Sequence, residues 1–139
     1  MQVVLENEAL KVTISSFGAE LASIRGKVTD TEYLWNADAK FWKRTAPVLF
    51  PFVGSLKNKE YHYEGKTYSM GQHGFARDME FAVDVQTATE AWFSLRSNEE
   101  TKAKFPLEFI LKIGYELEGK ELKVIWQVEN PDTKTLYFS

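Results

Sequence analysis

The sequence contains no cysteine, and this absence excludes several kinds of chemistry at once. Without a thiol the chain forms no disulfide, holds no thiolate metal site and has no cysteine nucleophile. Such a composition suits a reducing compartment, so we expect a cytoplasmic protein. The chain has two histidines. They lack the spacing to each other and to carboxylates that zinc sites show, so we expect no zinc.

Clustered positive charge and long apolar runs are also missing. The 17 Lys and Arg are outnumbered by 20 Asp and Glu. Nucleic-acid binding needs clusters of basic residues, and we therefore expect no nucleic-acid partner. The longest apolar run, residues 46–53, is far shorter than the roughly 20 residues that cross a bilayer. The N-terminus lacks the basic and apolar regions of a signal peptide. We expect no membrane segment.

The chain is rich in apolar residues that alternate with polar ones. Hydrophobic residues make up 44% of the chain and aromatic residues 14%, which is enough for a core and excludes intrinsic disorder. A period of two predicts strands, here at residues 2–5, 9–15, 20–24, 80–87, 90–97, 105–117 and 122–128. Strands so closely spaced, without long helices between them, predict an all-β fold, an antiparallel sandwich.

The segments between these strands give further predictions. Residues 61–68 read as a hairpin that turns at Glu64-Gly65. Residues 36–42 are the one stretch that predicts a short helix, whereas residues 98–104 read as a turn. Residues 134–138 begin a new strand just before the last residue. Because natural domains seldom end in this way, we expect residues 1–139 to be part of a larger β-sandwich domain.

His73 is the residue with the strongest potential for catalysis. It stands beside Gly74, in a loop with Gln, Arg and Asp neighbours that could orient an imidazole. Gly74 allows a ligand or a second strand to approach the backbone closely. The alternative is a structural histidine bonded to a carbonyl. His62 lies between two tyrosines of the predicted hairpin, where a surface position is expected.

Arg77 and three aromatic residues could form contacts to a ligand. The Arg77 guanidinium either pairs with the adjacent Asp78 at the surface or holds sugar hydroxyls, a carboxylate or a phosphate. Trp42, Phe50 and Phe52 either belong to the core or offer ring faces on which a pyranose stacks. The local sequence leaves both alternatives open.

Several segments together resemble one known family. They are Phe-Gly-Ala-Glu-Leu at 17–21, Glu-Tyr-Leu-Trp at 32–35, Ala-Pro-Val-Leu-Phe-Pro at 46–51, Gln-His-Gly-Phe-Ala-Arg-Asp at 72–78, Asn-Pro at 130–131 and Tyr-Phe-Ser at 137–139. With these segments the chain resembles the aldose 1-epimerase (galactose mutarotase) superfamily over its whole length. The likeness is to the branch of galactose mutarotase-related proteins that includes the LacX-like proteins.

The resemblance implies a fold, a reaction and site residues. The fold would be the N-terminal half of a galactose-mutarotase-like antiparallel β-sandwich, the supersandwich. The reaction would interconvert the α and β anomers of an aldose without a cofactor. In it, a carboxylate base takes the proton of the anomeric hydroxyl while a histidine acid protonates the ring oxygen. The family's first active-site histidine falls on His73, and the arginine of the same block falls on Arg77 as a sugar contact.

The sequence departs from the family pattern at two places. Ser55 stands where many relatives carry an arginine, and Lys57 is a weak substitute because an ammonium lacks the planar fork. The second histidine and the base glutamate would lie beyond Ser139, so we expect little activity from the isolated chain. The alternatives are a non-catalytic carbohydrate-binding module and an inactive fragment. Uncovered sheet edges of a half-sandwich also predict pairing with another copy.

Overall fold

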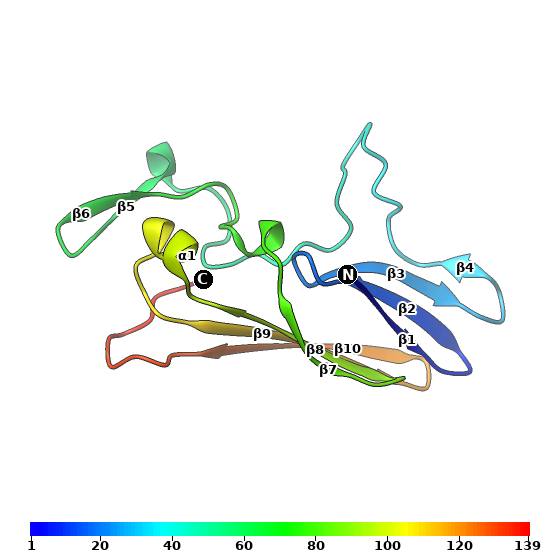
Figure 1. Cartoon of the computed structure of the whole chain (residues 1–139). Helices are drawn as coiled ribbons and strands as arrows, with labels where there is room; N and C mark the ends of the chain where they lie inside the picture. Colours follow the sequence, from blue (N-terminus) through cyan, green and yellow to red (C-terminus); the bar gives the residue numbers. More distant parts are fainter.

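A computed structural model describes all residues from 1 to 139 as two four-stranded sheets and a separate hairpin (Figure 1). The first sheet has the order β1 (Gln2–Glu6), β2 (Leu10–Ser15), β3 (Glu20–Gly26) and β4 (Thr31–Glu32). The second has the order β10 (Glu121–Glu129), β9 (Ile110–Glu118), β8 (Glu90–Arg96) and β7 (Ala82–Gln86). The hairpin consists of β5 (Glu60–Tyr63) and β6 (Lys66–Ser69). The all-β prediction is confirmed.

Helical structure is limited to three short segments. They are α1 (Glu99–Lys104) and the 3-10 helices η1 (Lys57–Lys59) and η2 (Ala76–Asp78). None of them has the length or the apolar composition that crossing a membrane requires.

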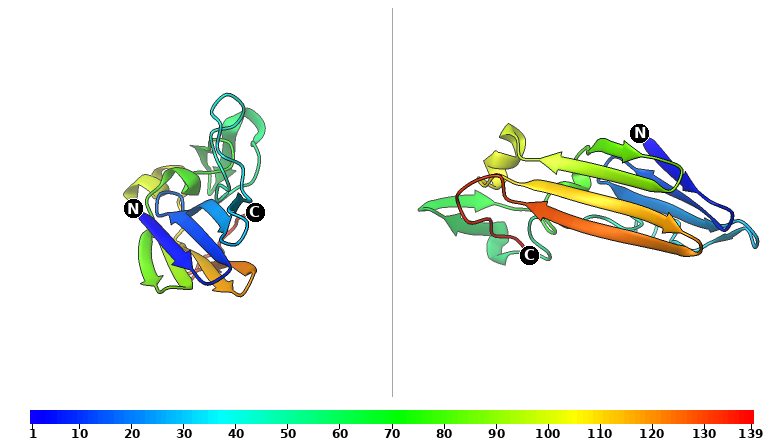
Figure 2. Two further views of the ribbon diagram at one scale, coloured as in Figure 1. Left: turned by 90° about the vertical axis from the view of Figure 1, so that its right-hand side faces the viewer. Right: turned by 90° about the horizontal axis from the view of Figure 1, so that it is seen from below.

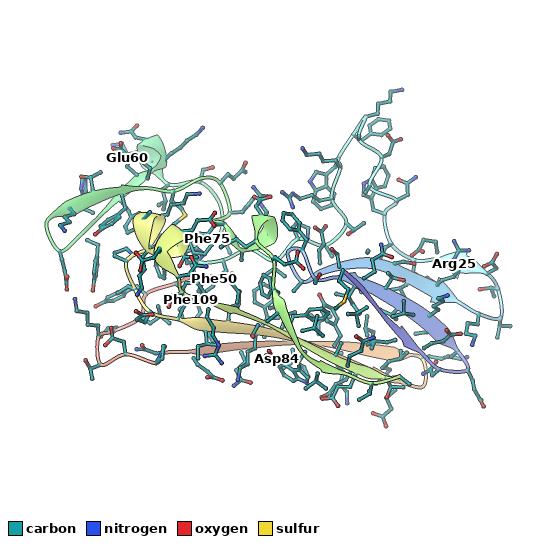
Figure 3. All side chains as sticks on the ribbon, in the orientation of Figure 1. Arg25, Phe50, Glu60, Phe75, Asp84 and Phe109 are labelled. Atoms are coloured by element: carbon teal, nitrogen blue, oxygen red, sulfur yellow. The ribbon has the colours of Figure 1, made fainter.

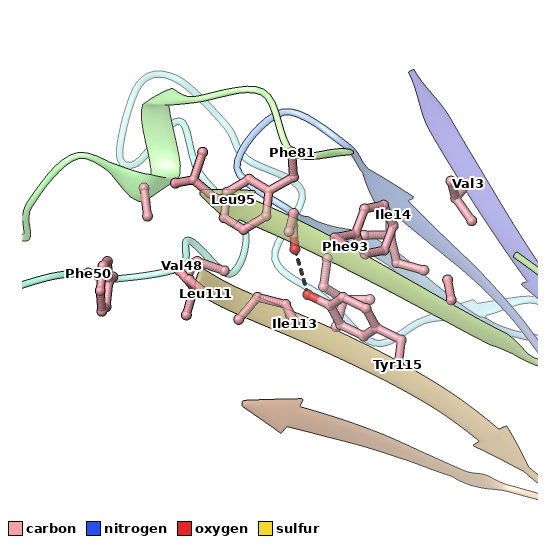
Figure 4. Close-up of a cluster of buried hydrophobic side chains, with 14 of the residues drawn as sticks. Val3, Ile14, Val48, Phe50, Phe81, Phe93, Leu95, Leu111, Ile113 and Tyr115 are labelled. Atoms are coloured by element: carbon pink, nitrogen blue, oxygen red, sulfur yellow. Dashed lines mark hydrogen bonds between the residues drawn. The ribbon is translucent and has the colours of Figure 1, made fainter. Parts of the chain in front are cut away.

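The two large sheets face each other as layers, as both views of Figure 2 show. Their core-facing side chains are the apolar members of the alternating pattern, and Figure 4 shows how they meet. The buried residues of the strands are Val3, Leu5, Leu10, Val12, Ile14 and Leu21 from the first sheet and Ala91, Phe93, Leu95, Leu111, Ile113, Tyr115 and Leu117 from the second. Burial of this set is the main stabilising contribution to the fold.

The sandwich is closed along one side and open along the other. On the closed side the Glu6 amide at the end of β1 donates to the Ala88 carbonyl in the β7–β8 turn over 2.7 Å. On the open side β10 lies at the edge of its sheet. There Val124 and Trp126 keep 47% and 49% of their surface exposed although they belong to the core-facing row. The half-exposed row therefore marks the side on which solvent reaches the interior of the sandwich.

A cluster of phenylalanines forms a second part of the core, at the hairpin end of the molecule. The ring centroid of Phe50 lies 5.0 Å from that of Phe109, 6.2 Å from that of Phe105 and 6.4 Å from that of Phe75. Figure 3 labels three of these rings where the loops meet the second sheet. The cluster therefore joins loops that are distant in sequence.

Two local predictions are wrong, the first because the backbone leaves the helical region and the second because of a cap. Residues 36–42 form no helix: Ala37 has a φ of 55°, and a single turn closes where the Asp38 carbonyl accepts from the Phe41 and Trp42 amides. Residues 99–104, which we expected as a turn, form α1. Here Asn98 and Thr101 make a capping box, in which each side chain bonds to the other residue's amide.

The hairpin prediction is confirmed and the last predicted strand is not formed. Glu64 and Gly65 both have positive φ, of 46° and 75°, as a two-residue hairpin turn requires. Residues 134–138 pair with no strand, and the chain is held at its end by the Ser139 amide, which donates to the Pro51 carbonyl over 2.9 Å. β3 also continues to Gly26, so its turn lies later than the sequence predicted.

Candidate functional site

A cavity of about 530 Å³ lies at the open side of the sandwich. The loop before η2 and η2 itself supply Gln72, His73 and Arg77, and the apolar wall comes about equally from strands of both sheets and from the segment 42–49. It is lined by Leu21, Trp42, Ala46, Pro47, Val48, Leu49, Gln72, His73, Arg77, Ile113, Tyr115, Val124 and Trp126. A mostly apolar wall with a few converging polar groups is typical of sites for small molecules.

His73 is held by two hydrogen bonds to one residue of a neighbouring loop. Its amide donates to the Gly54 carbonyl over 2.8 Å, and its ring atom Nδ1 accepts from the Gly54 amide over 2.9 Å. Because Nδ1 accepts, the neutral ring carries its proton on Nε2. The side chain is partly buried, and the ring lines the cavity. His73 therefore brings an N–H donor of fixed tautomer to the site.

Gly74 fixes the backbone that carries His73. Its φ is 73°, and a Cβ at this position would lie 2.0 Å from the Phe50 carbonyl oxygen. The same oxygen accepts from the amides of Phe75 at 2.9 Å and Ala76 at 3.2 Å. Only glycine fits both the positive φ and this close approach. The His73 loop is thereby docked on the buried Phe50 segment.

Arg77 belongs to η2 and is positioned by its neighbours. Its Nη2 atom donates to the Gln72 carbonyl over 2.8 Å, and its buried Nε atom has no hydrogen-bond partner. The Asp78 carboxylate lies 3.7 Å from Nε and is also bound by the Arg44 guanidinium. The Arg77 guanidinium thus makes one hydrogen bond, to a neighbouring carbonyl, and Arg77 lines the cavity.

Glu20 supports the wall of the cavity from β3. Its Oε1 atom accepts from the Thr45 amide at 2.7 Å and from the Ala46 amide at 3.1 Å. Its other carboxylate oxygen lies 3.7 Å from Arg44. These contacts fix the loop that continues into the cavity wall, and they occupy the carboxylate of Glu20 with a structural role.

Tyr115 is the only hydroxyl that lines the cavity. Its O–H donates to the Ala19 carbonyl over 2.7 Å, the bond drawn dashed in Figure 4. Burial, with the nearby Glu20 carboxylate, raises the pKa of the Tyr115 hydroxyl. Tyr115 is therefore protonated at neutral pH and engaged with the backbone. No Asp or Glu lines the cavity.

The structure brings together three of the residues predicted from the sequence, His73, Arg77 and Trp42. The three other predicted contacts lie outside the cavity. Phe50 is 1% exposed inside the phenylalanine cluster, and Phe52 packs with its ring centroid 5.2 Å from that of Tyr61. Lys57 is exposed in η1.

His62 lies where the sequence predicted it, exposed on β5, and its Nδ1 atom is 2.9 Å from the Thr67 hydroxyl. The sequence analysis did not assign Glu20, Arg44 or Trp126 to the site. Trp126 belongs to a strand that the alternation predicted, and its position on the core-facing row was the available signal. The residues that Glu20 and Arg44 contact are distant from them in sequence, so local sequence patterns could not predict these contacts.

Comparison with known proteins gives a consistent result. A family model described as aldose 1-epimerase matches residues 1–139. Protein LacX (chromosomal) of Lactococcus lactis subsp. lactis is 35% identical over 139 residues, which cover 96% of this chain and 46% of LacX. The chain thus spans about half the length of the curated relatives that it matches.

Two solved structures are similar in fold and sequence. A galactose mutarotase related enzyme from Lactobacillus acidophilus has a TM-score of 0.92 and 45% identity, covering 94% of this chain and 43% of that one. A galactose mutarotase-like protein from Lactobacillus casei has a TM-score of 0.93 and 40% identity, covering 96% of this chain and 46% of that one. The predicted resemblance and the galactose-mutarotase-like fold are confirmed.

Proposed function

The chain belongs to the aldose 1-epimerase family, and we propose that it supplies part of the site of an isomerase that interconverts sugar anomers. The substrate is a hexose or a related sugar, and the reaction opens and recloses its ring by acid/base chemistry without a cofactor. One observation carries this proposal: the Gly54 amide occupies Nδ1 of His73, so that the ring offers Nε2–H in a cavity that Arg77 also lines.

The tautomer of His73 defines its part in the reaction. When the bond between the anomeric carbon and the ring oxygen breaks, negative charge develops on that oxygen. A neutral imidazole that gave up its Nε2 proton would become an imidazolate, so His73 acts as a hydrogen-bond donor that stabilises this charge. The proton that the ring oxygen finally takes comes from a separate acid.

The anomeric hydroxyl loses its proton to a base as the ring opens to the aldehyde. Rotation about the bond between the first two carbons and reclosure then give the other anomer. No carboxylate lines the cavity and Tyr115 is engaged, so this base is not among the lining residues. Proton transfer to or from a positioned group contributes roughly 10²–10⁴-fold to a rate, so we propose that the isolated chain has little activity.

Arg77 and Trp42 are the proposed sugar contacts. The planar guanidinium of Arg77 matches pairs of sugar hydroxyls, and the half-exposed indole of Trp42 offers a face to a pyranose ring. Phe50, Phe52 and Lys57 lie outside the cavity, so we do not include them among the proposed sugar contacts. We place this activity in the cytoplasm, supported by the lack of cysteine.

A second candidate is a carbohydrate-binding protein without catalysis. The absence of Asp and Glu from the cavity favours it. Two measurements separate the candidates: NMR exchange spectroscopy on a panel of hexoses with a full-length relative, because we propose little activity for the isolated chain, and calorimetry with the isolated chain. Anomer exchange faster than in buffer indicates the isomerase, binding heat without faster exchange indicates the binder, and neither indicates an inactive fragment.

The catalytic proposal is tested by His73→Ala in a full-length relative, at the position aligned with His73. We expect anomer exchange to slow by about 10²-fold or more in a protein that still folds and melts cooperatively. His62→Ala at the exposed hairpin histidine is the matched control and should leave the rate unchanged. A His73→Ala protein that is folded and fully active would refute the role of His73.

A further inference from the structure

Arg44 is held outside the cavity and contacts three polar groups. It belongs to the segment between β4 and η1 and does not line the cavity itself. Its Nη2 atom binds one oxygen of the Asp78 carboxylate, and its Nη1 atom donates to the Arg77 carbonyl over 3.3 Å. Nη1 also lies 3.7 Å from the Glu20 carboxylate. Because only 20% of the Arg44 side chain is exposed, water screens these charge interactions weakly.

These contacts form a series of four charges that alternate in sign. The series begins at Glu20 on β3, whose carboxylate is fixed by two backbone amides. It continues through Arg44 and Asp78 and ends at Arg77, the only Lys or Arg that lines the cavity. Without Arg44 the series would hold two carboxylates and one guanidinium, and Asp78 would be left with Arg77 as its only ion-pair partner.

Arg77 and Asp78 are adjacent, yet their side chains form no hydrogen bond to each other. The Nε atom of Arg77 is buried without a hydrogen-bond partner, and the Oδ2 atom of Asp78 lies 3.7 Å away from it. This distance is about 0.8 Å longer than a usual hydrogen bond. An unpaired buried donor costs free energy, and a guanidinium and a carboxylate commonly form two parallel hydrogen bonds. A free Asp78 would therefore close on Arg77, but its other oxygen is bound by Arg44.

We propose that Arg44 is a positioning residue of the sugar site, which holds the Asp78 carboxylate away from the Arg77 guanidinium. The inference rests on the proposed function in one respect, that Arg77 is a sugar contact. In the absence of Arg44, the Asp78 side chain turns and its carboxylate takes Nε–H and a neighbouring N–H group of Arg77. Those donors are then lost to the sugar hydroxyls. Arg44 thus acts on the substrate only through Asp78 and Arg77.

The first test observes the Nε–H group of Arg77 by proton–nitrogen NMR in the 139-residue chain, so it does not depend on catalysis. In the Arg44→Met variant the Asp78 carboxylate should accept this proton, and the Nε–H signal should move downfield. In the double variant Arg44→Met, Asp78→Ala the acceptor is gone, and the signal should return to its position in the unmodified chain. Arg44→Gln, which retains a polar side chain without charge, is the second test variant and should behave as Arg44→Met.

The matched control is Arg25→Met, which breaks the same kind of ion pair elsewhere on the molecule. The Arg25 guanidinium lies 2.7 Å from the Asp30 carboxylate, and its side chain is 47% exposed. This substitution should leave the Nε–H signal of Arg77 unchanged. Arg44→Lys keeps a cation beside Asp78 and should restore most of the signal position lost in Arg44→Met. Circular dichroism melts of all variants identify any loss of fold.

The second test measures the kinetics of anomer exchange in a full-length relative that carries arginine and aspartate at the positions aligned with Arg44, Arg77 and Asp78. Arg44→Met should raise KM for the sugar about tenfold and change kcat by less than about threefold, because it weakens a binding contact. Adding Asp78→Ala should bring KM back to within about threefold of the unmodified enzyme. A purely structural role of Arg44 would instead make the two losses add.

Three results would overturn the inference. The first is an Nε–H signal of Arg77 that neither Arg44→Met nor Arg44→Gln moves, and the second is a signal that Arg25→Met moves as far. The third is a double variant whose KM is no lower than that of Arg44→Met. A relative that exchanges no hexose anomers overturns the proposed function instead, and the NMR signal of the chain then still decides whether Arg44 holds Asp78 away from Arg77.

Discussion

Two adjacent rows of side chains on one face of the second sheet differ in how deeply they are buried. β9 contributes Leu111, Ile113, Tyr115 and Leu117, all at most 5% exposed. Each pairs across the ladder with a member of the β10 row, which contains Leu122, Val124, Trp126 and Val128. The two rows are alike in apolar character and in alternation, yet the middle of the β10 row is half exposed.

The difference shows that alternation defines which face looks inward but not how much surface is removed from water. The β9 row lies under the first sheet, whereas the β10 row lies at the open side beside the cavity. Since hydrophobic stabilisation scales with the apolar area buried, the two rows should differ strongly in their effect on stability. Four measurements test this, from the largest expected effect to the smallest.

Ile113→Ala in β9 should lower the free energy of unfolding by about 2–5 kcal/mol, because it removes buried methyl and methylene groups and leaves a cavity. Ile113 is fully buried. The shift is measured as the urea unfolding midpoint by circular dichroism. A midpoint equal to that of the unmodified chain would show that the first sheet does not cover β9.

Tyr115→Phe should cost about 1–2 kcal/mol, because the Ala19 carbonyl is left without its hydroxyl donor in the core. The ring and its packing are unchanged, so the urea series isolates the hydroxyl. Tyr63→Phe, on the hairpin and away from this bond, serves as a control with little expected change. Equal effects of both substitutions would contradict the special position of the Tyr115 hydroxyl.

Alkaline pH should destabilise the fold through the half-buried Tyr61 and the buried Tyr115. Burial raises the pKa of Tyr61 to about 12 and also raises the pKa of Tyr115. An unfolded tyrosine ionises near pH 10, so the unfolded chain loses these protons first. The free energy of unfolding should be constant with respect to these groups below about pH 10 and should fall above it. For Tyr61 the fall ends near pH 12.

The measurement is the urea midpoint between about pH 8 and about pH 11, with Tyr115→Phe as the comparison. Removing the Tyr115 hydroxyl should make the alkaline decline shallower. An identical slope in both proteins would mean that Tyr115 ionises in the folded chain as easily as in the unfolded one.

Val124→Ala on β10 should have the smallest effect, within about 0.5 kcal/mol, when measured at concentrations where the chain is monomeric. Its side chain is half exposed in the folded chain, so little apolar area returns to water on unfolding. A loss comparable to that of Ile113→Ala would show that the β10 row is covered in solution.

Local patterns were sufficient to predict most of the strands. Alternation and turn residues act between neighbours in sequence, so the hairpin around Gly65 and the long strands β8, β9 and β10 follow from them. The helix predicted at residues 36–42 is wrong because cap residues there are not followed by a continuing helix, and the turn predicted at 98–104 is wrong because Asn98 and Thr101 form a capping box. The spacing of Asn98 and Thr101 was the signal that we missed.

The candidate site was predictable only in part. His73 and Arg77 belong to one short block, so their proximity was expected from the sequence. The bond from the Gly54 amide to His73, and the support of the cavity wall by Glu20, join residues 19 or more positions apart. Local propensity carries no information about such pairs, because only tertiary packing brings them together. The same limit applies to Phe50, whose aromatic side chain fitted a sugar contact as well as a core position.

The docking of the His73 loop on Phe50 has a consequence for hydrogen exchange. The amides of Phe75 and Ala76 donate to the Phe50 carbonyl, and that of His73 donates to Gly54. Phe50 is itself buried, so the Phe75 and Ala76 amides open only when the phenylalanine cluster comes apart, and they should exchange at the slow rate of global unfolding. The Phe41 amide, bonded within its own turn, should exchange through local fluctuations. The backbone that follows His73 should therefore keep its place for the lifetime of the folded state.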